Sequence, residues 1–220
     1  RSHPAEYPLK PPADNPCRAE LALTDWGFQP GLSPQVSADP AAYVPVKLPF
    51  MWAPQPAAAL LQAAQGKPWA NVDLGNLDTG WLETRVAIPA GWQGKAVYLK
   101  LEGLHCDAAI WVNGQKVGEL AGPDARLDVT SALVAGQEAR IQLWVTRWWQ
   151  GVTATQKDNA FRDAVIARAG SPGSAGREAL RKATAAGIQG GACLQAVPAG
   201  AEIEDLLVIP SFRTKELRVN

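Results

Sequence analysis

The sequence predicts an all-β protein built as an antiparallel β-sandwich. Apolar and polar residues alternate over much of the chain, an Asn-Gly dipeptide lies within the clearest alternating stretch, and turns rather than crossover helices separate its strands. Alternation at a period of two places apolar side chains on one face of a strand. Regularly spaced strands without crossover helices are typical of antiparallel sheets, so a sandwich is the expected architecture.

The stretch from Gly80 to Thr130 carries the strongest of these signals and is expected to form a meander of strands. Residues 97–101 alternate between apolar and polar side chains, as do residues 110–112, and residues 141–145 repeat the pattern. Asn113-Gly114 favours the positive φ angles of a two-residue hairpin turn. We therefore expect this stretch to organise the sheet.

Before this stretch, the sequence predicts an arm, two strands and a short helix. Residues 1–18 are rich in proline, which favours an extended N-terminal arm. Strands are expected over 19–28 and 43–48, the second stopped by a proline. The alanine-rich residues 54–66 predict one or two helical turns, and the polar residues 67–79 predict a long loop.

After it, the sequence predicts a helical turn and a helical insertion. Thr130 is expected to cap a brief turn that ends at Gly136. Residues 155–169 and 174–186 have helical spacing, which predicts a helical insertion over about 150–187.

Strand character returns near the C-terminus. Strands are expected over 192–197 and 203–209, which flank the start of a second unit. The strand-like residues at 216–220 have no expected closing partner, which suggests that further chain follows.

Composition excludes several classes of function. Lysine plus arginine number 21 and aspartate plus glutamate also number 21, so no broad charge favours nucleic acid or an anionic membrane. No apolar run reaches the ~20 residues of a membrane span. The chain begins at Arg1 without a signal-peptide pattern, and we expect either a cleaved signal or a trimmed sequence.

Cofactor and disulfide signals are weak. The two histidines form no metal cluster, and no run of oxygen ligands identifies a structural calcium, so no cofactor is expected. The three cysteines, Cys17, Cys106 and Cys193, allow at most one bridge, and packed thiols are the expected state.

Nine tryptophans outnumber tyrosine and phenylalanine together. An indole ring lies flat against the apolar face of a pyranose while its N–H donates one hydrogen bond, but it is equally a large core residue. Packing is the expected role within the strands, for Trp26, Trp81, Trp111 and Trp144.

Five residues in irregular segments are the candidate carbohydrate ligands. Trp69 lies in a polar loop with Asn71 and Asp73, whereas Trp148 and Trp149 are adjacent and enter a loop, where both rings cannot easily face the core. One of that pair is expected to face a ligand, a neighbouring domain or the inserted helices.

Carboxylates offer a competing, catalytic interpretation. A glycosidase needs two carboxyl groups that flank the scissile bond, and five are available in strands and loops, namely Asp73, Asp78, Glu83, Glu102 and Asp107. Solvated carboxylates are the commoner case in such positions, so no catalysis by this chain alone is expected.

The order of several short motifs resembles the N-terminal sugar-binding domain of glycoside hydrolase family 2, which includes β-galactosidases, β-glucuronidases and β-mannosidases. The resemblance covers residues from about 20 to 219. Its motifs, in order, are VKLPFMW (46–52), TGWLET (79–84), YLKLEGL (98–104), AAIWVNG (108–114) with Val117-Gly118, LDVT (127–130) with Gly136, and GIQGGACL (187–194) with Pro198.

The resemblance implies a jelly roll of the galactose-binding-like type over residues 19–199, followed at 200–220 by the start of an immunoglobulin-like domain. It further implies a non-catalytic auxiliary role, with carbohydrate and the downstream immunoglobulin-like and TIM-barrel domains of the parent enzyme as partners. The family's catalytic glutamates lie on the barrel, and the loops before Thr79 and before Gly187 correspond to those that reach it. A bacterial-type periplasmic or extracellular location is expected. The alternative is a purely structural module that docks onto neighbouring domains and has no sugar affinity.

Overall fold

The computed structural model describes residues 18–31, 40–104, 107–122, 124–146, 185–200, 208–211 and 216–219. Its strands are β1 (Ala19–Ala22), β2 (Asp25–Pro30), β3 (Val44–Lys47), β4 (Phe50–Ala53), β5 (Thr79–Ala87), β6 (Lys95–Leu101), β7 (Asp107–Val112), β8 (Gln115–Ala121), β9 (Ala125–Asp128), β10 (Glu138–Thr146), β11 (Ala186–Ile188), β12 (Ala192–Pro198), β13 (Val208–Ser211) and β14 (Glu216–Val219). The α-helix is α1 (Ala58–Ala63), and short 3₁₀ turns lie at Pro40–Ala42, Leu74–Asn76, Ala90–Trp92 and Thr130–Ala132.

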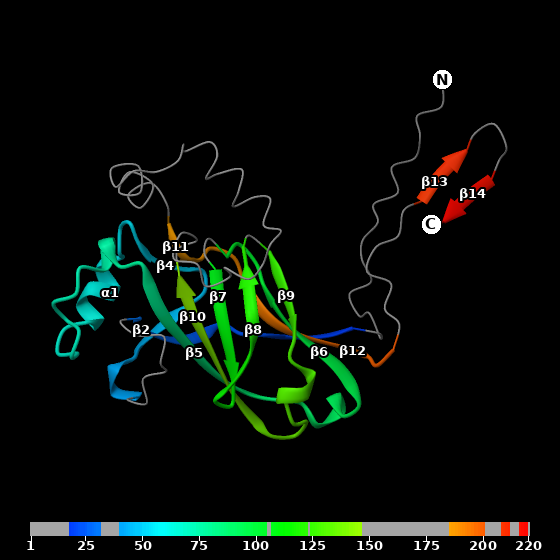
Figure 1. The fold of residues 1–220 in the computed structure, drawn as a ribbon, viewed down its shortest axis with the longest axis horizontal. Helices are drawn as coiled ribbons and strands as arrows, with labels where there is room; N and C mark the ends of the chain where they lie inside the picture. The colour runs from blue at the N-terminus through cyan, green and yellow to red at the C-terminus, as the bar shows by residue number, and fades with distance from the viewer. Residues whose placement is uncertain are drawn as a thin grey trace.

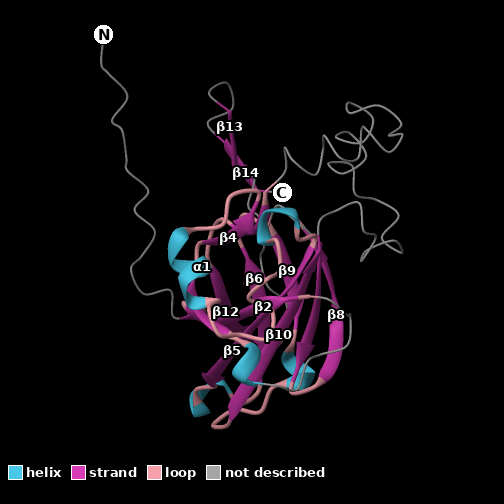
Figure 2. Cartoon of the chain, turned by 90° about the vertical axis from the view of Figure 1, so that its left-hand side faces the viewer, coloured by secondary structure: helices cyan, strands magenta, loops and turns pink. Residues whose placement is uncertain are grey.

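The strands form a β-sandwich, which confirms the predicted fold class. A six-stranded sheet has the order β3-β2-β5-β10-β7-β8, and a four-stranded sheet has the order β1-β12-β6-β9. Neighbouring strands in both sheets are antiparallel. The two layers are visible in Figures 1 and 2. Among the described residues, no helix has the length and apolar character that a membrane crossing requires.

The prediction of one continuous meander from Gly80 to Thr130 is wrong in its connections. β5, β7 and β8 belong to the six-stranded sheet, whereas β6 and β9 belong to the four-stranded sheet. Alternation identifies the buried face of each strand but not the sheet that the strand joins. The hairpin itself is confirmed: β7 and β8 pair, and the turn between them has φ angles of 52° at Asn113 and 85° at Gly114.

The single first strand predicted over residues 19–28 is also wrong. β1 pairs with β12 in one sheet, and β2 pairs with β3 and β5 in the other. The chain changes sheets at Leu23, whose carbonyl accepts a hydrogen bond of 2.9 Å from the Trp26 indole. The predicted strand over 43–48 and the helical turns within 54–66 are confirmed as β3 and α1.

The C-terminal end of the helix predicted over 174–186 is wrong, because Ala186 belongs to a strand. The rest of the insertion predicted over about 150–187, up to residue 184, lies outside the described residues. Ala186 is fully buried and begins β11, which pairs with β4. β4 itself was not among the predicted strands, because the proline-flanked run Phe50–Ala53 does not alternate with polar residues.

Thr130 begins a 3₁₀ turn but does not cap it. Its hydroxyl accepts a hydrogen bond of 2.8 Å from the Val97 amide, and its own N–H donates to the Asp128 carboxylate over 2.9 Å. The side chain therefore ties this turn to β6, while Asp128 supplies the local turn contact.

The space between the sheets is filled by apolar side chains, including an aromatic group near β4. Phe28 and Trp52 are fully buried and stack at a centroid distance of 5.2 Å, and Phe50 lies 5.0 Å from Phe28. Packing is confirmed for Trp26 and Trp81, which are buried. Trp111 and Trp144 are only half-buried.

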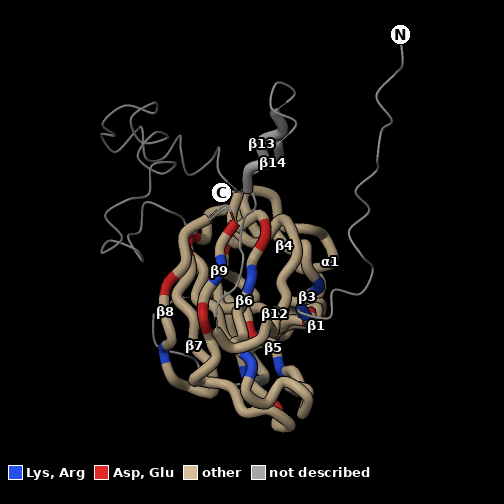
Figure 3. Tube along the Cα trace, turned by 90° about the vertical axis from the view of Figure 1, so that its right-hand side faces the viewer, with Lys and Arg blue, Asp and Glu red and all other residues tan. Residues whose placement is uncertain are grey.

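The C-terminal strands form a separate hairpin. β13 pairs with β14, so the expectation that the last strand lacks a partner is wrong. Cys193 on β12 is a free thiol, and burial raises its pKa. Acidic and basic residues are interspersed over the sandwich (Figure 3).

Gly80 on β5 is expected to be required for core packing. A Cβ atom there would lie 2.7 Å from the Phe28 ring and 3.1 Å from the Trp52 ring. Gly80→Ala is therefore expected to reduce the free energy of unfolding by about 1–3 kcal/mol, through overpacking. Urea denaturation measures the change. Gly91→Ala is the matched control, because a Cβ at Gly91 meets no atom within 4 Å. Equal stability of the two variants would contradict the packing argument.

Candidate functional site

The structure places the predicted ligand Trp69 in the core. Its indole N–H donates a hydrogen bond of 2.6 Å to the Ala42 carbonyl, and its ring meets Phe28 edge-on at 6.1 Å between centroids. The side chain is 6 % exposed. Both the ring and the N–H are therefore engaged within the protein.

Asn71 and Asp73 share the segment with Trp69 but not its environment. Both are exposed. The Asp73 carboxylate accepts a hydrogen bond of 2.5 Å from the Asn76 amide and precedes the 3₁₀ turn at Leu74–Asn76. The structure does not bring these two residues onto the indole, and their contact with carbohydrate stays a prediction. Trp148 and Trp149 lie outside the described residues.

A different surface gathers aromatic and polar side chains: the side of the six-stranded sheet that faces away from the four-stranded sheet, here called the outer face. Alternation in β5 and β10 puts Leu82 and Leu143 in the core, so their sequence neighbours point outward. The outer face comprises Gln29, Tyr43, Trp81, Glu83, Arg85, Trp111, Arg140, Gln142, Trp144 and Thr146.

Three tryptophans form the aromatic part of the outer face. Trp81 on β5 is directly opposite Trp144 on β10, at 6.2 Å between ring centroids, and Trp111 on β7 lies 5.0 Å from Trp81. The Lys116 ammonium lies 5.8 Å from the Trp111 ring. Trp81 is 1 % exposed, so the other two rings carry whatever aromatic surface remains.

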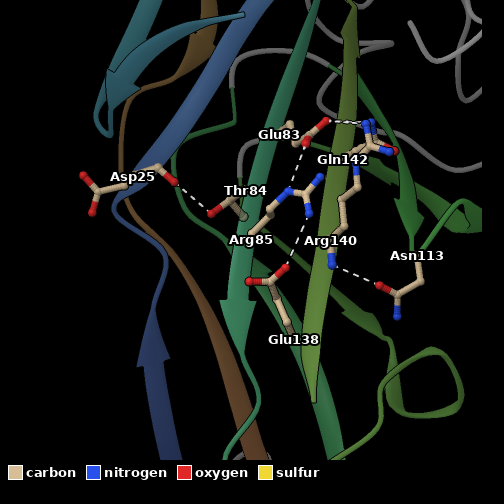
Figure 4. A network of polar contacts seen from close by, with 8 residues as sticks. All are labelled: Asp25, Glu83, Thr84, Arg85, Asn113, Glu138, Arg140 and Gln142. Atoms are coloured by element: carbon tan, nitrogen blue, oxygen red, sulfur yellow. Dashed lines mark hydrogen bonds and ion pairs between the residues drawn. The ribbon is translucent and has the colours of Figure 1, made fainter. Parts of the chain in front are cut away.

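Glu83 is the centre of the polar part (Figure 4). Its Oε2 accepts hydrogen bonds of 2.7 Å from Arg140 and 2.9 Å from Gln142, both on the neighbouring strand β10. Arg85 lies 3.7 Å from Glu83 Oε1 and 3.4 Å from Glu138. The hydrogen bond to Glu83 raises the pKa of Arg140. The network thus fixes the position of the Glu83 side chain.

Tyr43 lies beside this network. Its ring rests on Gly27, where a Cβ atom would come within 3.0 Å of it. Burial raises the pKa of the Tyr43 phenol, and the Glu83 charge acts in the same direction, whereas the neighbouring Gln29 amide opposes it. The phenol therefore stays neutral well above physiological pH.

Several buried polar atoms of the outer face have no hydrogen-bond partner within the part of the chain that the structure describes. They are Gln29 Nε2, Tyr43 OH, Arg140 Nε, Gln142 Oε1, Trp144 Nε1 and Thr146 Oγ1. The Tyr43 phenol still lies close enough to Gln29, Gln142 and Arg140 to interact with them, so Trp144 Nε1 and Thr146 Oγ1 are the clearest cases. A buried polar group without a partner destabilises a protein by about 1–3 kcal/mol. Such groups call for a functional or structural explanation wherever they cluster.

An open cleft lies where β2 and β5 meet the residue before β3. Its volume is about 310 Å³. Its lining consists of Asp25, Trp26, Gly27, Tyr43, Glu83, Thr84 and Arg85. A larger cavity of about 440 Å³ lies elsewhere, lined by Trp92, Leu133 and Val134 among others. No group of three or more histidine, cysteine or acidic side chains that could hold a metal ion occurs among the residues described.

The alternation of residues in β5 and β10 is a sequence signal for the outer face, and the number of tryptophans alone does not reveal it. Trp81, Glu83 and Arg85 alternate with core residues in β5, and Arg140, Gln142 and Trp144 do so in β10. The pairing of these two strands is a long-range property, so the clustering required the structure.

Tyr43→Phe is expected to make stability less sensitive to alkaline pH. The folded pKa is raised, so the phenol's contribution is present below the ordinary tyrosine pKa of about 10 and declines as pH rises above it. At pH 8 the variant should differ from the wild type by no more than about 1.5 kcal/mol, because the substitution removes only the hydroxyl and its polar contacts.

Urea midpoints of both proteins at pH 8 and pH 10.5 measure this difference. The wild type should lose more stability than Tyr43→Phe over this interval, and equal losses would show that Tyr43 is not perturbed by folding. The remaining tyrosines are common to both proteins and cancel in the comparison.

Comparison with known proteins identifies the domain. The family model for the sugar binding domain of glycosyl hydrolases family 2 matches residues 67–171. A β-glucuronidase structure from Faecalibacterium prausnitzii superimposes with a TM-score of 0.56 at 21 % identity, over 90 % of this chain and 34 % of its own. One from an uncultured Clostridium sp. gives 0.58 at 17 %, over 95 % of this chain and 35 % of its own.

A β-D-glucuronidase from Dictyoglomus thermophilum gives a TM-score of 0.56 at 15 % identity, over 91 % of this chain and 32 % of its own. At such identities the likeness shows a shared fold. This chain spans about a third of the length of these three structures. The family match over residues 67–171, the β-sandwich and the ordered motifs agree, and the chain is similar to the N-terminal sugar-binding domain of glycoside hydrolase family 2.

Proposed function

We propose that this chain is a non-catalytic auxiliary domain of a family 2 type glycoside hydrolase, and that it contacts carbohydrate while it supports the catalytic domain. The observation that carries the proposal is the outer face, where half-buried indoles lie beside an ordered carboxylate and side-chain amides. Aromatic rings beside hydrogen-bonding groups are the chemistry that recognises a sugar. The family match supports the same role.

Three of the five carboxylates considered for catalysis have other roles in the described structure. Glu83 is paired with Arg140, Glu102 with Lys100 at 2.7 Å, and Asp73 with Asn76. Glycoside hydrolysis needs one carboxyl group as an acid and a second as a base or nucleophile across the scissile bond. The described residues form a β-sandwich and no TIM barrel, so we assign the chemistry to another part of the parent enzyme.

The remaining parts of the proposal concern the parent protein. We infer that residues 19–199 form the auxiliary domain, that 200–220 begin an immunoglobulin-like domain, and that a TIM barrel is a further partner. A periplasmic or extracellular location suits an enzyme that acts on glycans. The β13–β14 hairpin is compatible with this division.

A second function, a structural module that docks onto neighbouring domains, is favoured by one observation. Trp111 and Trp144 are half-buried, and protein interfaces use tryptophan in this way. In that case the unpartnered atoms of the outer face would find their partners on another domain. Carbohydrate binding by the chain alone separates the two functions.

Isothermal titration of the 220-residue chain tests the carbohydrate role. The panel comprises galactosides, glucuronides, mannosides and plant oligosaccharides. One sugar ring of about 12 non-hydrogen atoms, at about 0.3 kcal/mol each, corresponds to a dissociation constant on the order of 1 mM. Millimolar binding of at least one sugar is the expected result. Circular dichroism checks that the chain is folded. If the folded chain gives no heat of binding with any ligand, the carbohydrate role is rejected and the structural module is the remaining function.

A further inference from the structure

The cleft on the outer face is lined by groups of complementary chemistry. Asp25 and Glu83 supply carboxylates, and Arg85 supplies a guanidinium group. Its volume of about 310 Å³ lies at the lower end of the range for small-molecule sites, which is about 300–1,000 Å³. The cleft therefore suits one small ring rather than an extended ligand.

The carboxylates of the lining retain capacity to accept hydrogen bonds. Glu83 Oε2 is occupied by Arg140 and Gln142, but Oε1 has only the Arg85 guanidinium at 3.7 Å. Asp25 is 77 % exposed, with Oδ1 3.6 Å from the Lys47 ammonium, and its Oδ2 accepts a hydrogen bond of 2.9 Å from the Thr24 hydroxyl. A carboxylate oxygen can accept more than one hydrogen bond, so both groups can still accept from a ligand.

The charge of the lining favours a neutral ligand. Within the lining, two carboxylates accompany one guanidinium, and Arg85 is already shared between Glu83 and Glu138. Lys47 and Arg140 contact the same carboxylates but do not line the cleft. Hydroxyl groups donate readily to such carboxylates. A carboxylate on the ligand would instead meet like charges from Asp25 and Glu83.

An aromatic ring forms one wall. Tyr43 packs over Gly27, because a glycine on β2 leaves room for the ring against the strand. The phenol oxygen is buried, so the accessible part of Tyr43 in the cleft is its ring. An aromatic wall beside carboxylates matches the apolar face and the hydroxyl edge of a pyranose.

We propose that this cleft binds one neutral hexopyranose unit, which deepens the proposed function and rests on it. The ring of Tyr43 packs against the apolar face of the sugar, the carboxylates of Asp25 and Glu83 accept from its hydroxyl groups, and Arg85 donates. The site discriminates against the corresponding uronic acid. It lies on the sheet face, apart from the loop residues Asn71 and Asp73.

The larger cavity beside Trp92 lacks these features. Two of its polar groups are used locally, because Asp128 accepts from the Thr130 N–H and the Thr130 hydroxyl contacts Val97. The remaining lining includes Leu133 and the exposed Val134. It serves as the alternative location in the test below.

A ¹H–¹⁵N correlation NMR titration of the whole chain locates the site. The probes are the methyl β-glycosides of glucose, galactose and mannose, with methyl β-glucuronide and methyl β-galacturonide as charged counterparts. The backbone amides of Gly27, Thr84 and Arg85 should shift with at least one neutral glycoside. The matching uronide should bind about threefold more weakly or worse, because of the lining charge.

Two variants of one residue test the aromatic wall. Tyr43→Phe keeps the ring and should bind within twofold of the wild type, whereas Tyr43→Leu should lose about tenfold in affinity. Tyr98→Leu is the control, a tyrosine on β6 in the other sheet whose ring is covered by Arg126 at 3.6 Å. Asp25→Asn removes one carboxylate at an exposed position. It should reduce the ratio of the affinity for the neutral glycoside to the affinity for the uronide, without altering the fold.

The outcomes separate this proposal from the proposed function. The chain could bind sugar with shifts at the amides of Val134 or Asn71 instead, and with unchanged affinity in Tyr43→Leu. This result would overturn the assignment of the site to the cleft and leave the carbohydrate role intact. Tighter binding of the uronides would overturn the preference for a neutral sugar. If the folded wild type binds no sugar of either panel, the carbohydrate role fails, and the cleft assignment fails with it.

Discussion

The antiparallel pairing of β5 with β10 is the constraint on which the rest of the structure depends. It joins nine residue pairs without interruption, from Glu138 opposite Ala87 to Thr146 opposite Thr79. This register places Leu82 beside Leu143 in the core and Glu83 beside Gln142 on the outer face. A slip of one residue would exchange the two faces, moving the leucines outward and the charged network into the core. Core packing therefore enforces the geometry of the outer face.

The two faces of β5 meet different demands. Inward, Gly80 and Leu82 fit against aromatic rings with no spare space, as protein cores require. Outward, Glu83 lies among arginines and amides, several of which keep a buried polar atom without a partner in the described structure. Natural proteins depart from full satisfaction of polar groups mainly where a ligand or partner is expected. Buried polar atoms without a partner in the described structure distinguish the outer face from an ordinary solvated sheet surface.

The sequence predicted the fold class, the Asn113-Gly114 hairpin and the burial of Trp26 and Trp81, because these depend on local period and turn chemistry. It did not predict which strands belong to which sheet, since alternation is the same in both. Nor did it distinguish a core indole from an exposed one at Trp69, because an indole suits either setting until its N–H partner, here the Ala42 carbonyl, is known. The candidate site on β5 and β10 joins residues 57 and 59 positions apart, a separation that no local pattern reveals.

The contacts of Glu83 explain why the outer face suits binding better than hydrolysis. A catalytic acid must hold a proton and release it, which requires an environment that disfavours its charge. Glu83 instead accepts hydrogen bonds from a guanidinium at 2.7 Å and from an amide at 2.9 Å, so its Oε2 is committed to contacts within the sheet. A carboxylate held in this way is an acceptor with a fixed direction. Because its position follows from strand register rather than from a loop, the acceptor is ordered before any ligand arrives, and little conformational entropy remains to be lost on binding.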